Sequence, residues 1–200
     1  MSDVTPVTWD ELQQAFALRP PDPLVPPAVA RAAVALVFAD GPDGIDLLFI
    51  RRADQDGDPW SGQMAFPGGR REQDDEDLPA TAVRETTEEV GINLIRQAQL
   101  LGGLDQIEAR ARRRKLGFGI APFAYRLRGA RQTVAGSEVA TIHWVPLDRL
   151  LDNDTRATHS HNDDGEVHDF PCRKLEGLVI WGLTFWMLED LLDRLDEVRG

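Results

Sequence analysis

The stretch that most constrains the fold is a short helix whose two ends are both marked in the sequence. Asp77 can accept a hydrogen bond from the first turn, and Pro79 is tolerated there because an N–H at that position would have no helical partner. Gly91 can adopt the left-handed conformation that ends a helix. We therefore predict a helix over Leu78–Val90, a short distance after the Phe-Pro-Gly-Gly turn at residues 66–69.

Three carboxylates fall on one face of this predicted helix. An α-helix turns by about 100° per residue, so Glu85, Glu88 and Glu89 lie within one sector. Like charges this close repel one another unless a cation neutralises them. Oxygen donors without a neighbouring Cys or His favour magnesium or manganese over zinc. The residues expected to pack against a sheet from the opposite face are Val83, Thr87 and Val90.

The acidic face has a plainer interpretation, because charge runs on helices are most often solvated surface. That interpretation would be favoured for the helix alone. The residues before the helix change the balance, since Gly68 and Gly69 provide flexible backbone whose amides can approach a phosphate. Arg70 and Arg71 follow directly, and Arg84 can reach one of the glutamates within the helix. We therefore predict a phosphate-handling site at this turn and helix.

Residues 69–92 resemble the signature of the Nudix hydrolases, in which a glycine, an early acid and an Arg-Glu-x-x-Glu-Glu-x-Gly-aliphatic run follow one another. The run at residues 84–92 fits at every charged and glycine position, with Thr86 in place of the usual aliphatic residue. The early acid is Asp75 or Glu76, depending on which spacer is one residue longer than usual. The resemblance implies an α/β fold, an α/β/α sandwich with a mixed β-sheet against which the catalytic helix packs.

Three further segments, at residues 47–52, 62–69 and 180–184, resemble the coenzyme A pyrophosphatase branch of this family. The resemblance then covers most of residues 30–192. This branch often has the longer spacer between glycine and helix, which favours Asp75 as the early acid. The sequence departs from the branch at residues 58–61, where Asp-Pro-Trp-Ser replaces a segment that commonly carries a basic residue.

The resemblance implies a metal-dependent hydrolase of the diphosphate linkage in a nucleoside diphosphate derivative, with Mg²⁺ or Mn²⁺ as cofactor. The implied metal ligands are Gly69, Glu85, Glu88 and Glu89. The implied catalytic residues are the same three glutamates, Arg84 and Glu138. The implied substrate-binding residues are Arg51, Gln63, Phe66, Gly68, Gly69, Arg70, Arg113 and Arg114.

Two of the acidic residues have alternatives. Glu138 precedes a predicted strand and is either a further metal ligand or proton acceptor, or a solvated carboxylate. For Asp75, charge complementarity to the N-terminus of the helix is favoured over direct metal contact.

The implied substrate is coenzyme A or one of its thioesters, split into adenosine 3′,5′-bisphosphate and 4′-phosphopantetheine. The only basic cluster, at residues 112–115, lies between two predicted strands and can receive a 3′-phosphate, although a solvated loop is the plainer interpretation. Nucleoside triphosphates, ADP-sugars and dinucleotides are the alternatives within this chemistry. A non-catalytic nucleotide sensor is the alternative from another class.

Several rings outside the signature have two interpretations. Aromatic residues that can stack on an adenine, but more often anchor a core or a loop, are Trp60, Phe66 and Trp181. Three irregularly spaced histidines stand near acidic residues, and exposed, non-ligating side chains are favoured over a metal site: His159, His161 and His168.

Composition limits the partners. The chain has 34 acidic and 22 basic residues and a net charge of −12, which argues against coating nucleic acid or a membrane surface. The longest apolar stretch, Leu178–Leu188, is too short to cross a bilayer, and residues 1–18 lack the pattern of a secretory signal. We therefore expect a cytoplasmic protein that binds a small-molecule substrate, as a monomer or a homodimer, with Cys172 as an inert thiol.

Five prolines among residues 20–27 separate two parts of the chain. We predict a helix (Trp9–Ala17) and a proline-rich extension over residues 1–29, and a Nudix hydrolase domain with a C-terminal helix over residues 30–200. Turn chemistry at residues 41–44 between two apolar runs predicts a hairpin or a pair of neighbouring strands. The polar segment at residues 152–170 predicts an exposed loop. The predicted strands are residues 32–38, 45–50, 100–104, 118–127 and 139–145, and the last helix is residues 178–198.

Overall fold

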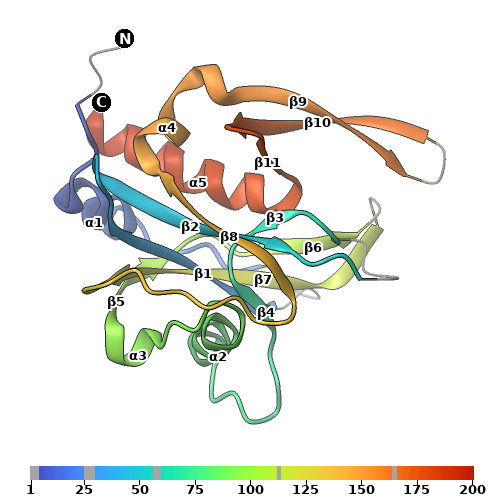
Figure 1. Ribbon diagram of the computed structural model, residues 1–200, viewed down its shortest axis with the longest axis horizontal. Coiled ribbons are helices and arrows are strands. Elements are labelled where there is room, and N and C mark those ends of the chain that lie inside the picture. The colour runs from blue at the N-terminus through green and yellow to red at the C-terminus, as the bar shows by residue number, and fades with distance from the viewer. Residues whose placement is uncertain (1–4, 25–29, 56–59, 112–113, 164–165) are drawn as a thin grey trace.

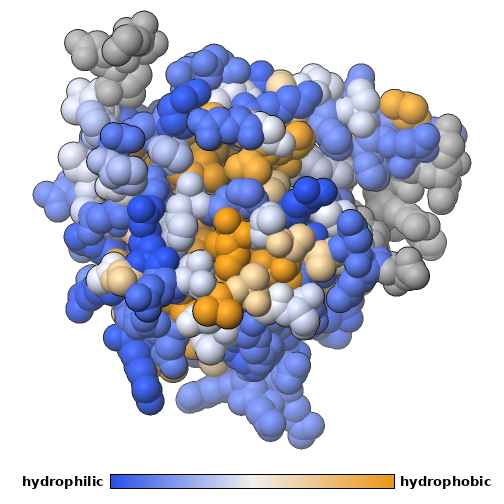
Figure 2. Space-filling view, viewed as in Figure 1, coloured by the Kyte–Doolittle hydropathy of each residue, from blue (hydrophilic) through white to orange (hydrophobic). Residues whose placement is uncertain are grey.

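The computed structural model describes residues 5–24, 30–55, 60–111, 114–163 and 166–200. They form three layers, with a mixed β-sheet between helices on its two faces (Figure 1). This is the α/β/α sandwich that the sequence predicts. In the described part of the chain, no helix is long and apolar enough to cross a membrane. The surface seen in Figure 2 is mostly hydrophilic, with a few apolar patches near its centre.

Strand β1 (Ala30–Asp40) is the centre of the eight-stranded sheet. It runs parallel to β7 (Arg114–Leu127) and antiparallel to β2 (Ile45–Arg52), to which the predicted hairpin joins it. Most residues of β1 are buried, as expected for a strand that is covered on both faces. The remaining strands of this sheet are β3 (Met64–Ala65) and β8 (Val139–Pro146) beside β2, β4 (Gly68–Arg70) beside β1, and β5 (Ala98–Gly103) and β6 (Ile107–Ala111) beside β7.

The two faces of β1 carry side chains of different size. Ala33, Ala35 and Ala39 face helix α2 (Leu78–Val90), whereas Phe38 faces the opposite layer. Small side chains leave room for the backbone of a helix to lie close to the strand. The alanines therefore bring α2, with its carboxylates, near the edge formed by β1 and β4. A short helix, α3 (Leu94–Gln97), follows α2 on the same side of the sheet.

Helix α2 begins and ends where the sequence predicts. The Asp77 side chain accepts a hydrogen bond from the Ala80 N–H at 2.8 Å, and Gly91 ends the helix with φ of 74°. Both signals act within one turn of the helix, so its bounds can be predicted from the local sequence alone.

The buried stripe of α2 is rotated relative to the prediction. Val90 is buried as expected, and half-buried Val83 packs against the same core cluster. Thr87 is exposed, so the expectation for this residue is wrong. A different set of α2 residues packs against the alanines of β1, and this set includes Glu89, whose carboxylate is buried. The buried residues of α2 are Thr81, Ala82, Thr86, Glu89 and Val90.

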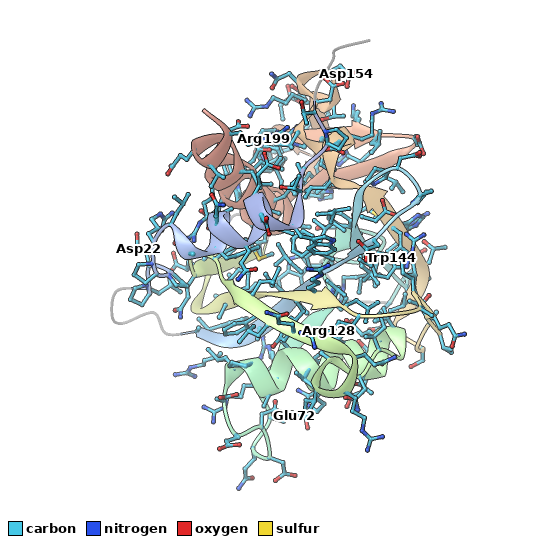
Figure 3. All side chains as sticks on the ribbon, turned by 90° about the vertical axis from the view of Figure 1, so that its left-hand side faces the viewer. Asp22, Glu72, Arg128, Trp144, Asp154 and Arg199 are labelled. Carbon is cyan, nitrogen blue, oxygen red and sulfur yellow. The ribbon has the colours of Figure 1, made fainter. Side chains whose placement is uncertain are left out.

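Helices α1 (Trp9–Ala17) and α5 (Gly182–Arg199) cover the other face of the sheet and pack against each other. The predicted bounds of α1 are confirmed. Buried Arg194 on α5 binds Asp105 at 2.8 Å and Asp190 at 3.0 Å. Arg19, just after α1, binds the same Asp105 at 2.6 Å. These ion pairs fasten the N-terminal segment to the C-terminal helix. Figure 3 shows Arg199 on α5 across the sheet from Glu72, which precedes α2.

The polar segment at residues 152–170 is not the exposed loop that its composition predicted. After α4 (Leu147–Leu151) and a 3-10 turn (Asn153–Thr155), strand β9 (Arg156–Asp163) pairs antiparallel with β10 (Glu166–Leu175). The prediction of a helix from residue 178 is also wrong. Residues 178–181 form β11 (Leu178–Trp181), which pairs with β10, and Gly182, with φ of 66°, begins α5 directly after this strand. Cross-strand ring packing holds these polar strands together, which a composition argument does not detect.

Candidate active site

The candidate active site forms where the glycine turn meets α2. The Gly68 N–H donates to Glu89 Oε2 at 2.8 Å. A Cβ on Gly69 would lie 2.2 Å from Glu85 Oε1, and a Cβ on Gly68 would lie 2.3 Å from the Ala33 carbonyl oxygen. Neither position has room for a side chain, so the two glycines allow the turn to touch both the carboxylates and β1.

Arg84 connects the turn, the preceding loop and the acidic face. Its Nε and Nη2 atoms donate to the two carboxylate oxygens of Asp75, both at 3.0 Å. Its Nη1 atom lies 3.0 Å from Glu85 Oε1 and 3.2 Å from Glu88 Oε2. The Arg70 carbonyl oxygen accepts a further hydrogen bond at 3.0 Å. Arg84 therefore fixes the spacing between two of the three glutamates.

Asp75 holds Arg84 in place. Its buried carboxylate also accepts hydrogen bonds from the Glu72 N–H at 2.9 Å and the Thr81 hydroxyl at 3.0 Å. Glu76 is exposed, and only its carbonyl oxygen has a described contact, with Arg71. From the sequence we predicted only that Arg84 contacts a glutamate within its own helix. Its contact with Asp75 was not predicted, because that contact depends on the conformation of the intervening loop.

We expect Asp75→Asn to destabilise the protein at neutral pH. The change weakens charge-assisted hydrogen bonds worth about 1.5–3 kcal/mol, and each kcal/mol lowers Tm by about 2–4 °C in a chain of this size. The bonds from Arg84 hold the pKa of Asp75 well below its ordinary value of 3.8. The stabilisation is therefore present at neutral pH and is lost as the pH falls below that value.

Thermal unfolding at neutral pH and at about pH 3 measures this difference. The expected gap in Tm between the two proteins is largest at neutral pH and shrinks in acid. Glu76→Gln, at an exposed neighbouring position, is the matched control and should leave Tm unchanged. An Asp75→Asn variant as stable as the parent at neutral pH would exclude the role of Asp75 in holding Arg84.

Burial favours the protonated form of the carboxylates on the acidic face, where little positive charge opposes it. It raises the pKa of Glu89 to about 7, opposed by the Gly68 N–H and reinforced by the charges of Glu85 and Glu138. Burial also raises the pKa of Glu85, although Arg84 partly offsets it. A neighbouring positive charge would stabilise both carboxylates in their ionised form.

The donor set fits a hard divalent cation. Among the residues that the structure describes, no three Asp, Glu, His or Cys side chains already stand in a ligating arrangement. The Nη1 atom of Arg84 contacts the carboxylates of both Glu85 and Glu88. The side chains available are all carboxylates, and the backbone of Gly69 lies against the carboxylate of Glu85. Such oxygen donors suit Mg²⁺ or Mn²⁺.

The predicted substrate-binding residues do not all have accessible side chains. Arg51 is exposed on β2 and its Nε donates to the Gly62 carbonyl oxygen at 3.3 Å, while Gln63 is half-buried beside it. The Phe66 ring is 2% exposed and lies 4.9 Å from the Phe49 ring. Phe66 therefore supports the turn from within the core, and its ring does not face solvent.

Two other predicted residues lie near the acidic face. The Arg70 guanidinium lies 4.7 Å from the centre of the Phe118 ring. Glu138 is exposed at the start of β8, and its charge contributes to the raised pKa of Glu85 and of Glu89. The position of Glu138 thus keeps open its predicted role as a further acid of the site.

Arg114 and Lys115 of the basic cluster do not lie in a loop as predicted. Strands β6 and β7 form a hairpin in which Ala111 pairs with Arg114, so Arg114 and Lys115 already belong to β7. Arg112 and Arg113 lie outside the described residues. The sequence analysis missed β6 and the first residues of β7 because this run is dominated by charged residues, which are poor strand indicators.

The family model of the NUDIX domain matches residues 29–165, more than half of the chain. The chain belongs to the Nudix family. The match includes the glycine turn, α2 and Glu138, whereas β10, β11 and α5 follow it in the sequence.

Curated relatives agree with this assignment. The Nudix chain is 31% identical over 167 residues to an uncharacterized Nudix hydrolase, NudL, of Yersinia pestis, covering 82% of the chain and 79% of that relative. It is 28% identical over 165 residues to the mitochondrial Nudix hydrolase 15 of Arabidopsis thaliana, covering 79% of the chain and 56% of that relative. A match of 38% identity to an uncharacterized protein of Schizosaccharomyces pombe covers 42% of the chain and 30% of that relative. The chain thus spans only part of the length of two of these relatives.

Solved structures share the fold of this Nudix chain. The Nudix hydrolase RenU of M. smegmatis aligns with a TM-score of 0.53 at 20% identity, covering 85% of each chain. The NUDIX domain of Shewanella oneidensis NrtR, complexed with ADP ribose, aligns with a TM-score of 0.51 at 16% identity, covering 97% of this chain and all of that one. At these identities the alignments establish the α/β/α Nudix fold.

Proposed function

We propose that this Nudix protein hydrolyses the diphosphate linkage of a nucleoside diphosphate derivative with Mg²⁺ or Mn²⁺. The observation that carries the proposal is the packing of the Gly68-Gly69 turn directly against two carboxylates of α2. In this proposal Glu85, Glu88, Glu89 and Gly69 hold the metal. A structural helix would not need carboxylates buried with so little opposing charge.

The divalent cation would screen the negative charge of the diphosphate and make water a better nucleophile. Arg84, fixed by Asp75, holds Glu85 and Glu88 at the spacing described above. One of the glutamates or Glu138 accepts the proton of the attacking water. The oxygen of that water bonds to one phosphorus atom, and the bridging oxygen leaves with the other phosphate.

Coenzyme A or a thioester of it is the proposed substrate, giving adenosine 3′,5′-bisphosphate and 4′-phosphopantetheine. The support is the resemblance of residues 47–52, 62–69 and 180–184 to the coenzyme A pyrophosphatase branch. Nucleoside triphosphates, ADP-sugars and dinucleotides are the alternatives, and ADP ribose and Ap4A appear in the names of solved Nudix structures. We propose a cytoplasmic enzyme acting on a small molecule, without nucleic acid or membrane, and able to form a homodimer.

A panel of these compounds, assayed with Mg²⁺ and Mn²⁺ and with identification of the products, tests the proposal. Release of adenosine 3′,5′-bisphosphate and 4′-phosphopantetheine from coenzyme A is the expected result. Preference for another member of the panel would refute coenzyme A as the substrate but would still support hydrolysis of a diphosphate linkage. Nucleotide binding without turnover of any member would instead favour a sensor.

The basic cluster provides a sharper test of the substrate. If residues 112–115 bind the 3′-phosphate, neutral replacements should reduce kcat/KM for coenzyme A much more than for 3′-dephospho-coenzyme A. Loss of even one charge-assisted contact, worth about 1.5–3 kcal/mol, changes the ratio of the two kcat/KM values by at least about tenfold. An unchanged ratio would mean that the cluster is only solvated surface.

A further inference from the structure

Five rings lie together on one face of the β9–β10 hairpin and the neighbouring β11, and we refer to them as the ring face. The Trp181 ring is central, with its centroid 4.7 Å from those of both His159 and His161. The Phe170 ring lies 5.4 Å from Trp181 and 6.5 Å from His168. Paired strands place alternate residues on the same side, which explains why these rings meet. All five side chains are half-buried, so each keeps an accessible part.

The ring face begins close to the turn that carries the candidate active site. Trp181 precedes Gly182, where a Cβ would lie 3.9 Å from Gln63 Oε1. Strand β11 packs beside β3, and the hairpin extends away from the sheet past it (Figure 1). Gln63 stands five residues before Gly68, whose N–H binds Glu89. Five residues span at most about 18 Å, so one extended nucleotide-derived molecule can reach both places.

The chemistry of the ring face suits a nucleobase better than a phosphate. Trp, Phe and His rings offer flat surfaces on which bases stack, and imidazole nitrogens can exchange hydrogen bonds with a base edge. Lys174 on β10 donates to the Thr158 carbonyl oxygen at 2.9 Å, and the Glu166 carboxylate lies 3.5 Å from His168 Nε2. The accessible part of the face therefore presents rings rather than positive charge.

We propose that the ring face receives the nucleobase of the substrate, which stacks on Trp181 while the diphosphate lies at the carboxylates of α2. The inference rests on the proposed function for the reaction, although base binding itself can be measured without it. Phe170 and Trp181 lie beyond residue 165, where the match to the family model ends, so this contact is a property of the C-terminal part of this chain. The competing explanation is that the rings only stiffen a polar hairpin.

Two probes separate these explanations: ADP, and ribose 5-diphosphate, which is the same molecule without the base. In the presence of Mg²⁺, Trp181→Leu should weaken ADP binding by about five- to 150-fold, the range expected for a lost stacking contact. The same change should leave ribose 5-diphosphate binding unaltered. Isothermal calorimetry gives both dissociation constants without relying on fluorescence.

Trp186→Leu is the matched control. Trp186 lies on α5, five residues after Trp181, and is 57% exposed. Its ring is 5.1 Å from that of Phe185 and does not belong to the ring face. It should change neither dissociation constant. His161→Gln is the milder second variant, which keeps a hydrogen-bonding side chain on β9 and should weaken ADP binding selectively, by a smaller factor.

Equal losses for both probes, or no loss for ADP in any folded variant, would overturn the proposal. The outcome is separate from that of the hydrolase assay. Selective loss of ADP binding in a protein that hydrolyses none of the panel would keep the base site and refute the proposed reaction. Normal hydrolysis without a base-dependent loss would refute only the base site.

Discussion

Chelation of divalent cations should abolish turnover of the diphosphate substrate, and added Mg²⁺ or Mn²⁺ should restore it. Glu85 and Glu89 are largely buried, and the pKa of Glu89 is raised to about 7, which marks a face short of positive charge. Arg84 already shares its charge with Asp75 and two glutamates. A diphosphate approaching this face without a metal would meet strong like-charge repulsion, so we expect loss of activity to the assay limit.

The measurement is the steady-state rate in excess chelator, followed by a titration with each metal. Thermal unfolding in chelator checks that the fold persists, so that a lost rate reports the reaction and not denaturation. Full turnover in excess chelator would refute the metal-dependent chemistry proposed here.

We expect Glu89→Gln and Glu88→Gln to lower kcat by a factor of about a hundred or more, because each removes a charge that holds the metal and stabilises the transition state. Both variants should fold. A glutamine at position 89 can still accept the hydrogen bond from Gly68. Glu88 is exposed, so its replacement leaves the core undisturbed.

Single-turnover and steady-state rates at saturating metal test this expectation, with circular dichroism to confirm the fold. Glu76→Gln is the control, since Glu76 is an exposed acid near the same helix without a described side-chain contact to it. A folded variant with the parental rate would remove that glutamate from the site.

Local signals explain which parts of the fold could be predicted. Helix α2 depends on Asp77 and Gly91, which act within one turn of the chain, and its bounds were predicted correctly. Strands β9 and β10 pack around Trp181, which lies 22 residues after His159 and 11 after Phe170, and they were predicted as a loop. Strands that depend on such contacts cannot be predicted from local composition.

The same reasoning applies to the candidate site. The spacing of the glutamates on one helix predicted that they share a face, and the contacts of Arg84 with two of them agree with this. The burial of Glu89 and the hydrogen bonds from Arg84 to Asp75 were not predicted. The first depends on the alanines of β1, and the second on the path of a loop.

The pairing of α1 with α5 has a consequence for the order of folding. Leu12 and Phe16 of α1 belong to the same core cluster as Leu191 and Leu195 of α5, although nearly the whole chain separates them. During synthesis the apolar stripe of α1 therefore leaves the ribosome long before its partner exists. We therefore expect this stripe to stay exposed on the nascent chain until α5 has been synthesised.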